Sequence, residues 1–187
     1  MAKSWNTARY FNATLLKNAL VRKRPLAIVF AKTHADVSTV LKQARASGLT
    51  VAVRSGGHSY AGYSVSGPNG ITIDVSGMNS VERLALESRL GDSNASTSNN
   101  CLVRVGAGAT WMKVYEALGD NALIVGGGCG TVGVGGYTLG GGVGYLSRVY
   151  GLAVDNVVGY VRTADVLFIF LSFLIFPRRT CGSKRIF

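Results

Sequence analysis

Residues 54–64, with the sequence RSGGHSYAGYS, constrain the fold of this chain most, because two adjacent glycines come shortly after the short apolar run 50–53. Glycine has no Cβ, so it adopts positive φ at little cost and lets a ligand approach the backbone closely. Successive N–H groups in such a turn form a concave nest that binds phosphate oxygens. His58 comes next and would lie beside the bound group. A plain turn with an exposed histidine is the alternative that this short segment leaves open.

A second glycine-rich stretch covers residues 126–144. It contains no G-K-[ST] sequence of a nucleotide P-loop. Its glycines alternate with threonine, valine, tyrosine and leucine, whereas a flexible linker would combine glycine with serine. This composition indicates a backbone that packs closely against a flat partner and offers N–H groups to it.

The net charge of +11 is concentrated at the two ends of the 187 residues. Residues 1–24 hold six basic and no acidic residues, and residues 162–187 hold five basic and one acidic residue. The middle of the chain is close to neutral, so nucleic-acid binding is not expected. Three widely spaced cysteines and two histidines predict neither a disulfide framework nor a metal site.

The first half of the chain predicts a β-α-β unit with parallel strands at 26–30 and 50–54. Thr33 and Asp36 have the spacing of a helix start between these strands. The first glycine loop then leaves the carboxyl end of the second strand, which is where open α/β sheets bind ligands. Further along, the pattern predicts a polar connector at 88–100, a helix after Thr110, and strands at 70–75, 102–105, 122–125 and 152–161.

The apolar run 166–176 is eleven residues long, which is too short for a membrane-spanning helix of about 20 residues. It also lacks the alternation of a half-buried strand. We therefore expect it to be foreign to the domain, from translated non-coding sequence or a shifted frame. The predicted division is a basic segment 1–24, a domain 25–161 and a non-family tail 162–187.

The two glycine stretches and the segments between them resemble the FAD-linked oxidases of the berberine-bridge-enzyme type. The matching segments occur in family order over about residues 20–161: RSGGHSY at 54–60, IDVSGMN at 73–79, VGAG at 105–108, GCGTVGVGG at 128–136 and YGLAVDNV at 150–157. The resemblance implies an α+β fold, the PCMH-type FAD-binding domain of the vanillyl-alcohol-oxidase family. Such a domain joins a small parallel β-α-β subdomain to a mostly antiparallel sheet with helices, here in truncated form.

The resemblance also implies the site residues. By position, His58 would hold the 8α-methyl group of FAD covalently, and Cys129 would bond flavin C6. The remaining residues implied to line the cofactor are Arg54, Ser55, Gly56, Gly57, Ser59, Thr131, Val132, Gly133, Gly136 and Tyr137. Tyr137 stands where many relatives have histidine, and Gly130 replaces a common proline. The catalytic base is expected in a substrate domain that this chain lacks.

The implied activity is oxidation of a small alcohol, sugar or C–H substrate, with O₂ reoxidising the flavin. The alternatives are a non-catalytic FAD-binding module, an inactive truncated gene product, or a membrane-tethered protein, of which the last is disfavoured. The resemblance implies a secretory or extracellular compartment, although residues 1–25 show no continuous apolar signal-peptide core.

Overall fold

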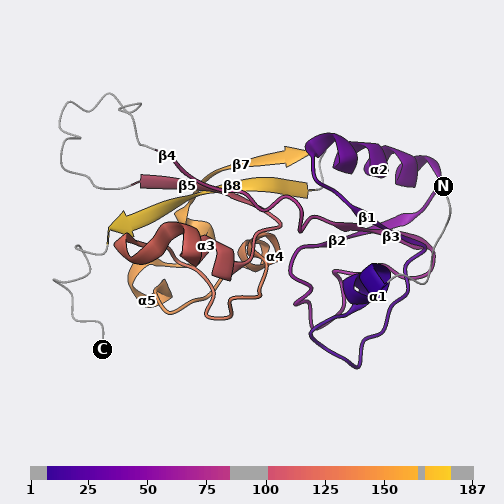
Figure 1. The fold of residues 1–187 in the computed structure, drawn as a ribbon, viewed down its shortest axis with the longest axis horizontal. Helices are drawn as coiled ribbons and strands as arrows, with labels where there is room; N and C mark the ends of the chain where they lie inside the picture. Colours follow the sequence, from indigo (N-terminus) through magenta and orange to yellow (C-terminus); the bar gives the residue numbers. More distant parts are fainter. Residues whose placement is uncertain (1–7, 85–100, 164–166, 178–187) are drawn as a thin grey trace.

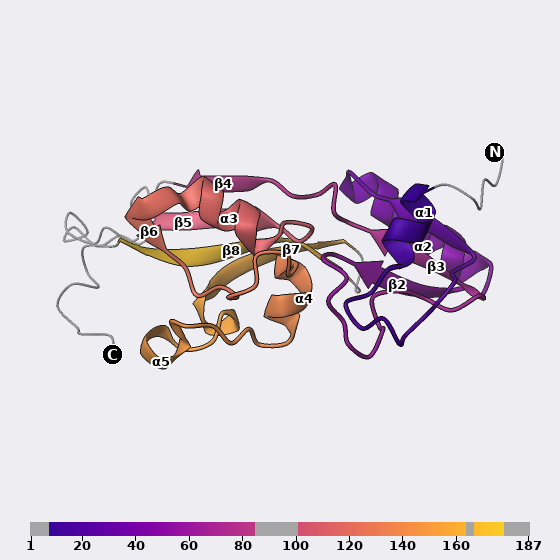
Figure 2. The same ribbon diagram turned by 60° about the horizontal axis from the view of Figure 1, so that its bottom comes forward.

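The fold has two sheets that lie side by side, each covered by helices (Figures 1 and 2). It is known from a computed structural model that describes residues 8–84, 101–163 and 167–177. The expected polar connector at 88–100 lies outside the described residues, as do both chain ends. The glycine loops lie at the junction of the two sheets.

The first sheet is parallel and has the order β1-β3-β2. Its strands are β1 (Ala27–Phe30), β2 (Thr50–Arg54) and β3 (Gly70–Asp74). The predicted parallel arrangement of the first two is confirmed, but both pair with β3 instead of with each other. The β2–β3 register sets Arg54 opposite Asp74 at the carboxyl end of the sheet.

Helix α2 (His34–Ala46) covers one face of this sheet, and α1 (Ala8–Thr14) lies on the other (Figure 1). α2 begins with the predicted capping box, in which the Asp36 N–H donates to the Thr33 hydroxyl and the Asp36 carboxylate accepts from the Thr33 N–H. Its buried stripe packs on the sheet through Val37 and Val40. This packing fixes the sheet from which the first loop emerges.

The second sheet is antiparallel and contains β4 (Val81–Leu84), β5 (Cys101–Gly106), β8 (Leu167–Pro177), β6 (Ala122–Leu123) and β7 (Val157–Thr163). β8 is central, with β5 on one side and β6 and β7 on the other. The helical elements beside it are α3 (Trp111–Leu118), η2 (Gly119–Asn121), α4 (Val134–Leu139), α5 (Ser147–Tyr150) and η3 (Val154–Asn156). The fully buried Trp111 anchors the core between this sheet and α3 and α4.

Two predicted strands are shorter than expected. The strand at 122–125 has only two paired residues, because the chain then turns into the glycine stretch with Ile124 and Val125 buried in the core. The strand at 152–161 begins at Val157, since residues before it form η3. There the Asn156 amide donates to the carbonyls of Tyr150 and Leu152 and holds the chain in a turn.

The apolar run 166–176 was expected to belong to a tail outside the domain, and the structure places its described part inside the second sheet. Leu167–Pro177 forms β8 within the second sheet, with its backbone paired on both edges. Phe173 is fully buried and lies edge-on to Trp111, with 6.2 Å between ring centroids. The domain boundary at 161 stays a prediction, as does the foreign origin of the run. In the structure, however, the run is a strand of the sheet and not a detached tail.

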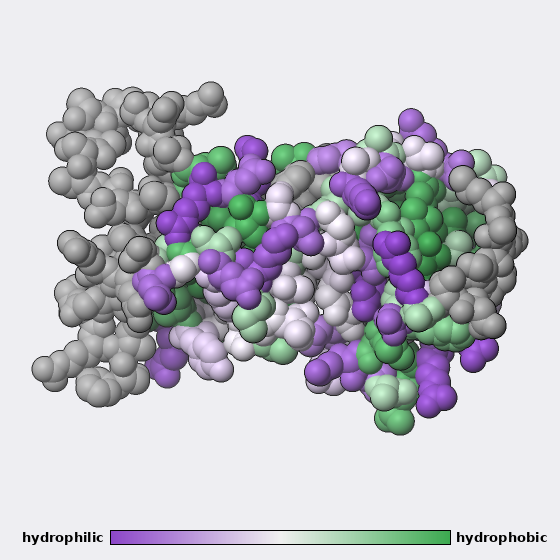
Figure 3. Space-filling view, viewed as in Figure 1, coloured by the Kyte–Doolittle hydropathy of each residue, from purple (hydrophilic) through white to green (hydrophobic). Residues whose placement is uncertain are grey.

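Within the described ranges, no helix is both long and apolar enough to cross a membrane. Hydrophobic and hydrophilic residues are interspersed on the face shown in Figure 3, with hydrophobic residues reaching the surface over the first sheet.

We expect Phe173→Ala to destabilise the protein by about 3–5 kcal/mol, because it leaves a cavity beside Trp111. Guanidinium unfolding monitored by tryptophan fluorescence measures this. Val158→Ala on β7 is the control, since that side chain is 58% exposed and should change stability by less than about 0.5 kcal/mol. Equal stability of Phe173→Ala and the parent chain would mean that β8 is not part of the folded core.

Candidate functional site

The two glycine loops touch backbone to backbone. The first loop (residues 55–59) follows β2, and the second loop (residues 128–133) precedes α4. A Cβ added at Gly56 would lie 2.5 Å from the Gly133 nitrogen and 2.7 Å from the Thr131 carbonyl oxygen. A Cβ at Gly133 would in turn collide with Ser55 Oγ. Only glycine fits on both sides of this contact.

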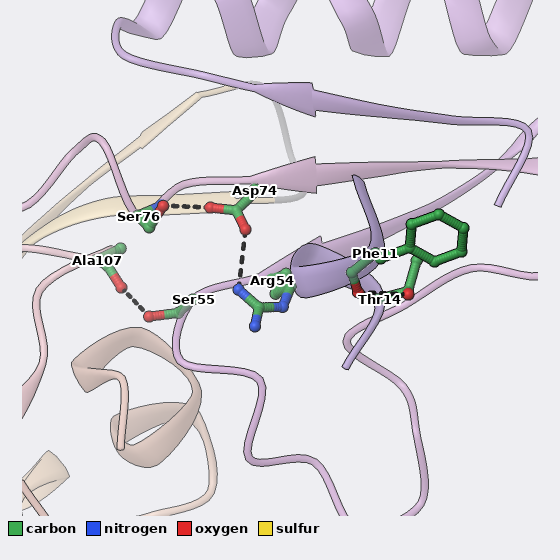
Figure 4. Close-up of polar contacts among 7 residues, drawn as sticks. All are labelled: Phe11, Thr14, Arg54, Ser55, Asp74, Ser76 and Ala107. Carbon is green, nitrogen blue, oxygen red and sulfur yellow. Dashed lines mark hydrogen bonds and ion pairs between the residues drawn. The ribbon is translucent and has the colours of Figure 1, made fainter. Parts of the chain in front are cut away.

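Polar contacts at the ends of the strands hold the first loop (Figure 4). Arg54 forms an ion pair with Asp74 at 2.9 Å, and the other Asp74 oxygen accepts from the Ser76 N–H at 2.9 Å. The Ser55 hydroxyl donates to the Ala107 carbonyl at 2.7 Å. Since Ala107 directly follows β5, Ser55 connects the first loop to the second sheet.

The second loop is fixed by the start of α3. The N–H groups of Trp111 and Met112 donate to the carbonyls of Val132 and Gly130 at 3.1 and 2.9 Å. A further bond joins the Val134 N–H to the Ala109 carbonyl at 2.9 Å. Both loops are therefore held against the same turn, which connects β5 to α3.

His58 and Cys129 converge on one side chain, the hydroxyl of Thr131. His58 Nε2 lies 2.9 Å from Thr131 Oγ1, and Cys129 Sγ lies 3.4 Å from the same atom. Cys129 and Thr131 are exposed, whereas His58 is half-buried. An imidazole and a thiol from loops 71 positions apart (residues 58 and 129) thus share one hydrogen-bonding neighbour.

Burial lowers the pKa of His58, and the cationic Lys17 and Arg54 lower it further. Because an unperturbed histidine titrates near pH ~6.5, the imidazole is neutral at pH 7. A neutral imidazole keeps a lone pair on one ring nitrogen. That nitrogen can accept a proton or form a bond to carbon.

Hydrogen bonds from the Thr131 hydroxyl and backbone lower the pKa of the Cys129 thiol, and the charge of Lys17 acts in the same direction. The thiolate is the nucleophilic form of cysteine. The site therefore combines a neutral imidazole with a thiol that ionises more readily than usual.

Other expected site residues lie around this pair in different roles. Tyr137 packs edge-on against Trp111, with 5.0 Å between centroids and its hydroxyl buried, so it faces the core more than the His58–Cys129 pair. Val132 also packs on the core. The Ser59 hydroxyl accepts from the Tyr63 N–H and shapes the first loop. Gly136 is exposed, with open space where a Cβ would be.

The first loop fits an anionic group. Among the described residues, no hydrogen bond takes up the backbone N–H groups of Gly57, His58 or Ser59. Gly57 has φ of 71° and lies against the Arg54 guanidinium. Arg54 Nε is buried, and no partner for it lies in the described part of the chain. Free N–H groups beside a guanidinium are a suitable donor set for phosphate oxygens.

Sequence analysis missed the contribution of the basic N-terminal segment to this site. The Lys17 N–H donates to the Gly57 carbonyl at 3.2 Å, next to His58. The Asn18 amide and the Lys23 ammonium donate to the carbonyls of Tyr60 and Gly62 at 3.0 and 2.8 Å. The density of basic residues was the one available signal, and it indicated neither the loop nor the contact.

Opposite stability changes are expected at two glycines of the same stretch. Gly133→Ala inserts a methyl group between the loops and should destabilise by about 1–3 kcal/mol. Gly136→Ala meets open space within α4 and should stabilise by about 0.5–1 kcal/mol. Urea unfolding of both variants measures the difference. Equal effects would show that the loops do not make the tight contact.

Comparison with known proteins identifies the family of the chain. Residues 25–162 match the FAD binding domain family. The chain is 41% identical over 139 residues to an FAD-dependent monooxygenase of Fusarium proliferatum, covering 73% of this chain and 24% of that protein. It is 36% identical over 148 residues to reticuline oxidase of Eschscholzia californica, covering 77% and 25%. The chain thus spans about a quarter of the length of these relatives.

Solved structures have the same fold. The wild-type BBE-like 1 protein of Physcomitrella patens superposes with a TM-score of 0.73 at 27% identity, over 91% of this chain and 40% of that one. A chitooligosaccharide oxidase superposes with a TM-score of 0.76 at 23% identity, over 92% and 40%, and supports the fold alone. These similarities confirm the expected PCMH-type fold, and the chain belongs to the FAD binding domain family, among berberine bridge enzyme-like and related flavoproteins.

Proposed function

We propose that these 187 residues are the FAD-binding part of an oxidoreductase that attaches its flavin covalently through His58 and Cys129. The observation that supports this most is the convergence of His58 Nε2 and Cys129 Sγ on Thr131 Oγ1. A histidine and a cysteine that only pack in the core would be buried among apolar side chains, whereas these two contact an exposed hydroxyl between two glycine loops. The family of the chain supplies the cofactor class.

In this proposal the first loop binds the pyrophosphate through its free N–H groups and through Arg54, whose orientation Asp74 fixes. The second loop would hold the flat ring system, because its glycines let the backbone approach a ligand closely. FAD, when bound, supplies a hydride acceptor for a small alcohol, sugar or C–H substrate and is reoxidised by O₂. The neutral His58 and the readily ionised Cys129 supply the two attachment atoms.

The second candidate is a non-catalytic FAD-binding module, which uses the same loops and differs in lacking a base that acts on substrate. About three quarters of the length of the relatives has no counterpart in this chain. Substrate, catalytic base and a secretory compartment therefore belong to the proposal for a complete oxidase and not to these residues.

The test is to express the chain with FAD and measure the flavin absorbance that remains with acid-precipitated protein. We expect covalent flavin in the parent chain, partial retention when either His58→Ala or Cys129→Ala is made alone, and none in the double variant. The matched control is His34→Ala, which removes the other histidine of the chain in the first turn of α2.

Flavin that binds and is released by acid would contradict covalent attachment while leaving FAD binding intact. A folded chain that neither retains flavin nor quenches its fluorescence would contradict the proposed function as a whole.

A further inference from the structure

The N-terminal segment that precedes the family match forms part of the site. The family match begins at residue 25, whereas Lys17, Asn18 and Lys23 each donate a hydrogen bond to a carbonyl of the chain between residues 57 and 62. Leu16 and Val21 add apolar contacts at Gly62, where a Cβ would meet both side chains. The segment therefore contacts the first loop at Gly57 and the turn that follows the loop at Tyr60 and Gly62, which gives three hydrogen bonds in all.

Lys17 is the basic residue of this segment whose backbone bonds to the first loop. The Lys17 N–H donates to the carbonyl of Gly57, the residue that precedes His58. The backbone of Lys17 therefore lies beside the segment that carries the imidazole. The side chain is exposed, and none of the ion pairs among the described residues includes it. The other nearby cation, Arg54, is paired with Asp74 at 2.9 Å.

The charged groups that act on the reactive pair are all cationic. Lys17 and Arg54 act on His58, and Lys17 acts on Cys129. No carboxylate among the described residues acts on either group. Because a cation stabilises an anion and destabilises a second cation, this setting favours thiolate at Cys129 and neutral imidazole at His58.

We infer that Lys17 is a positioning residue of the site, a cation held by the N-terminal segment that favours the thiolate of Cys129 and the neutral form of His58. The inference rests on the proposed function only where it takes the thiolate to be the group that attaches flavin. The effect of the Lys17 charge on Cys129 and His58 does not require flavin. The inference also gives the basic segment a role, because the segment hydrogen-bonds to the first loop at Gly57 and carries the positive charge of Lys17.

The test uses the flavin-free 187-residue chain and measures how fast iodoacetamide alkylates Cys129, followed on its peptide by mass spectrometry from pH 6 to 10. For Lys17→Met we expect a rate about two- to threefold lower at pH 7, because removing the cation lowers the thiolate fraction. The rate at high pH, where the thiol is fully ionised, should match the parent chain. Added salt should shrink the difference, since the charges are exposed.

Lys17→Arg keeps the charge and should restore the parent profile, while Lys42→Met removes an equal charge from the exposed surface of α2 and should have no effect. A second readout is the NMR titration of His58, whose midpoint should rise in Lys17→Met. The inference is overturned if the profile of Lys17→Met superposes on that of the parent chain, if Lys42→Met slows alkylation as much as Lys17→Met does, or if Lys17→Arg fails to restore the parent profile. A purely structural role would change the high-pH rate and persist in salt.

These outcomes separate the inference from the proposed function. A chain that shows the Lys17 effect and binds no flavin would contradict the function and not the electrostatics. A chain that attaches flavin and shows no effect of Lys17→Met would contradict the inference about Lys17 and leave the proposed function intact.

Discussion

The backbone contact between Gly56 and Gly133 determines where every other group of the site lies. One glycine lies in the loop that follows β2 of the first sheet, and the other precedes α4 beside the second sheet. With no Cβ on either side, the loops approach to a separation that side chains would prevent. Ser55 and Thr131 flank the contact, and His58 and Cys129 then meet at the Thr131 hydroxyl. The site therefore depends on a close approach of two sheets, and each sheet alone would present only half of it.

The charges around that contact favour anions. Asp74 pairs with Arg54 and offsets part of its charge, whereas Lys17, whose backbone N–H bonds to Gly57, takes part in no ion pair among the described residues. Loop N–H groups, a guanidinium and an ammonium all donate hydrogen bonds and cannot accept them. A phosphate and a thiolate are stabilised by the same field, so the pyrophosphate binding that we propose and the lowered pKa of Cys129 would have one physical cause.

Features that depend on local sequence were predictable, and features that depend on distant contacts were not. The capping box of α2 requires only Thr33 and Asp36, three residues apart. Resemblance to a family assigned His58 and Cys129 to one flavin ring and so implied that they lie close together, and the structure places both at the Thr131 hydroxyl. By contrast, the central place of β3, the bond from Ser55 to Ala107 across 52 residues, and the contact of Lys17 with Gly57 depend on how separate segments pair. Periodicity and composition contain no information on register between such segments.

β8 shows why local pattern and position in a sheet are different properties. The family match ends at residue 162, yet Leu167–Pro177 lies between β5 and β7 with its backbone paired on both sides. Ladder hydrogen bonds involve N–H and C=O groups that every residue except proline has, so they do not require a family sequence. The run is rich in phenylalanine and isoleucine, which are common in strands, and the backbones of β5 and β7 provide its pairing partners. A segment beyond the family match therefore completes this sheet, and the burial of Phe173 beside Trp111 joins it to the core of the domain.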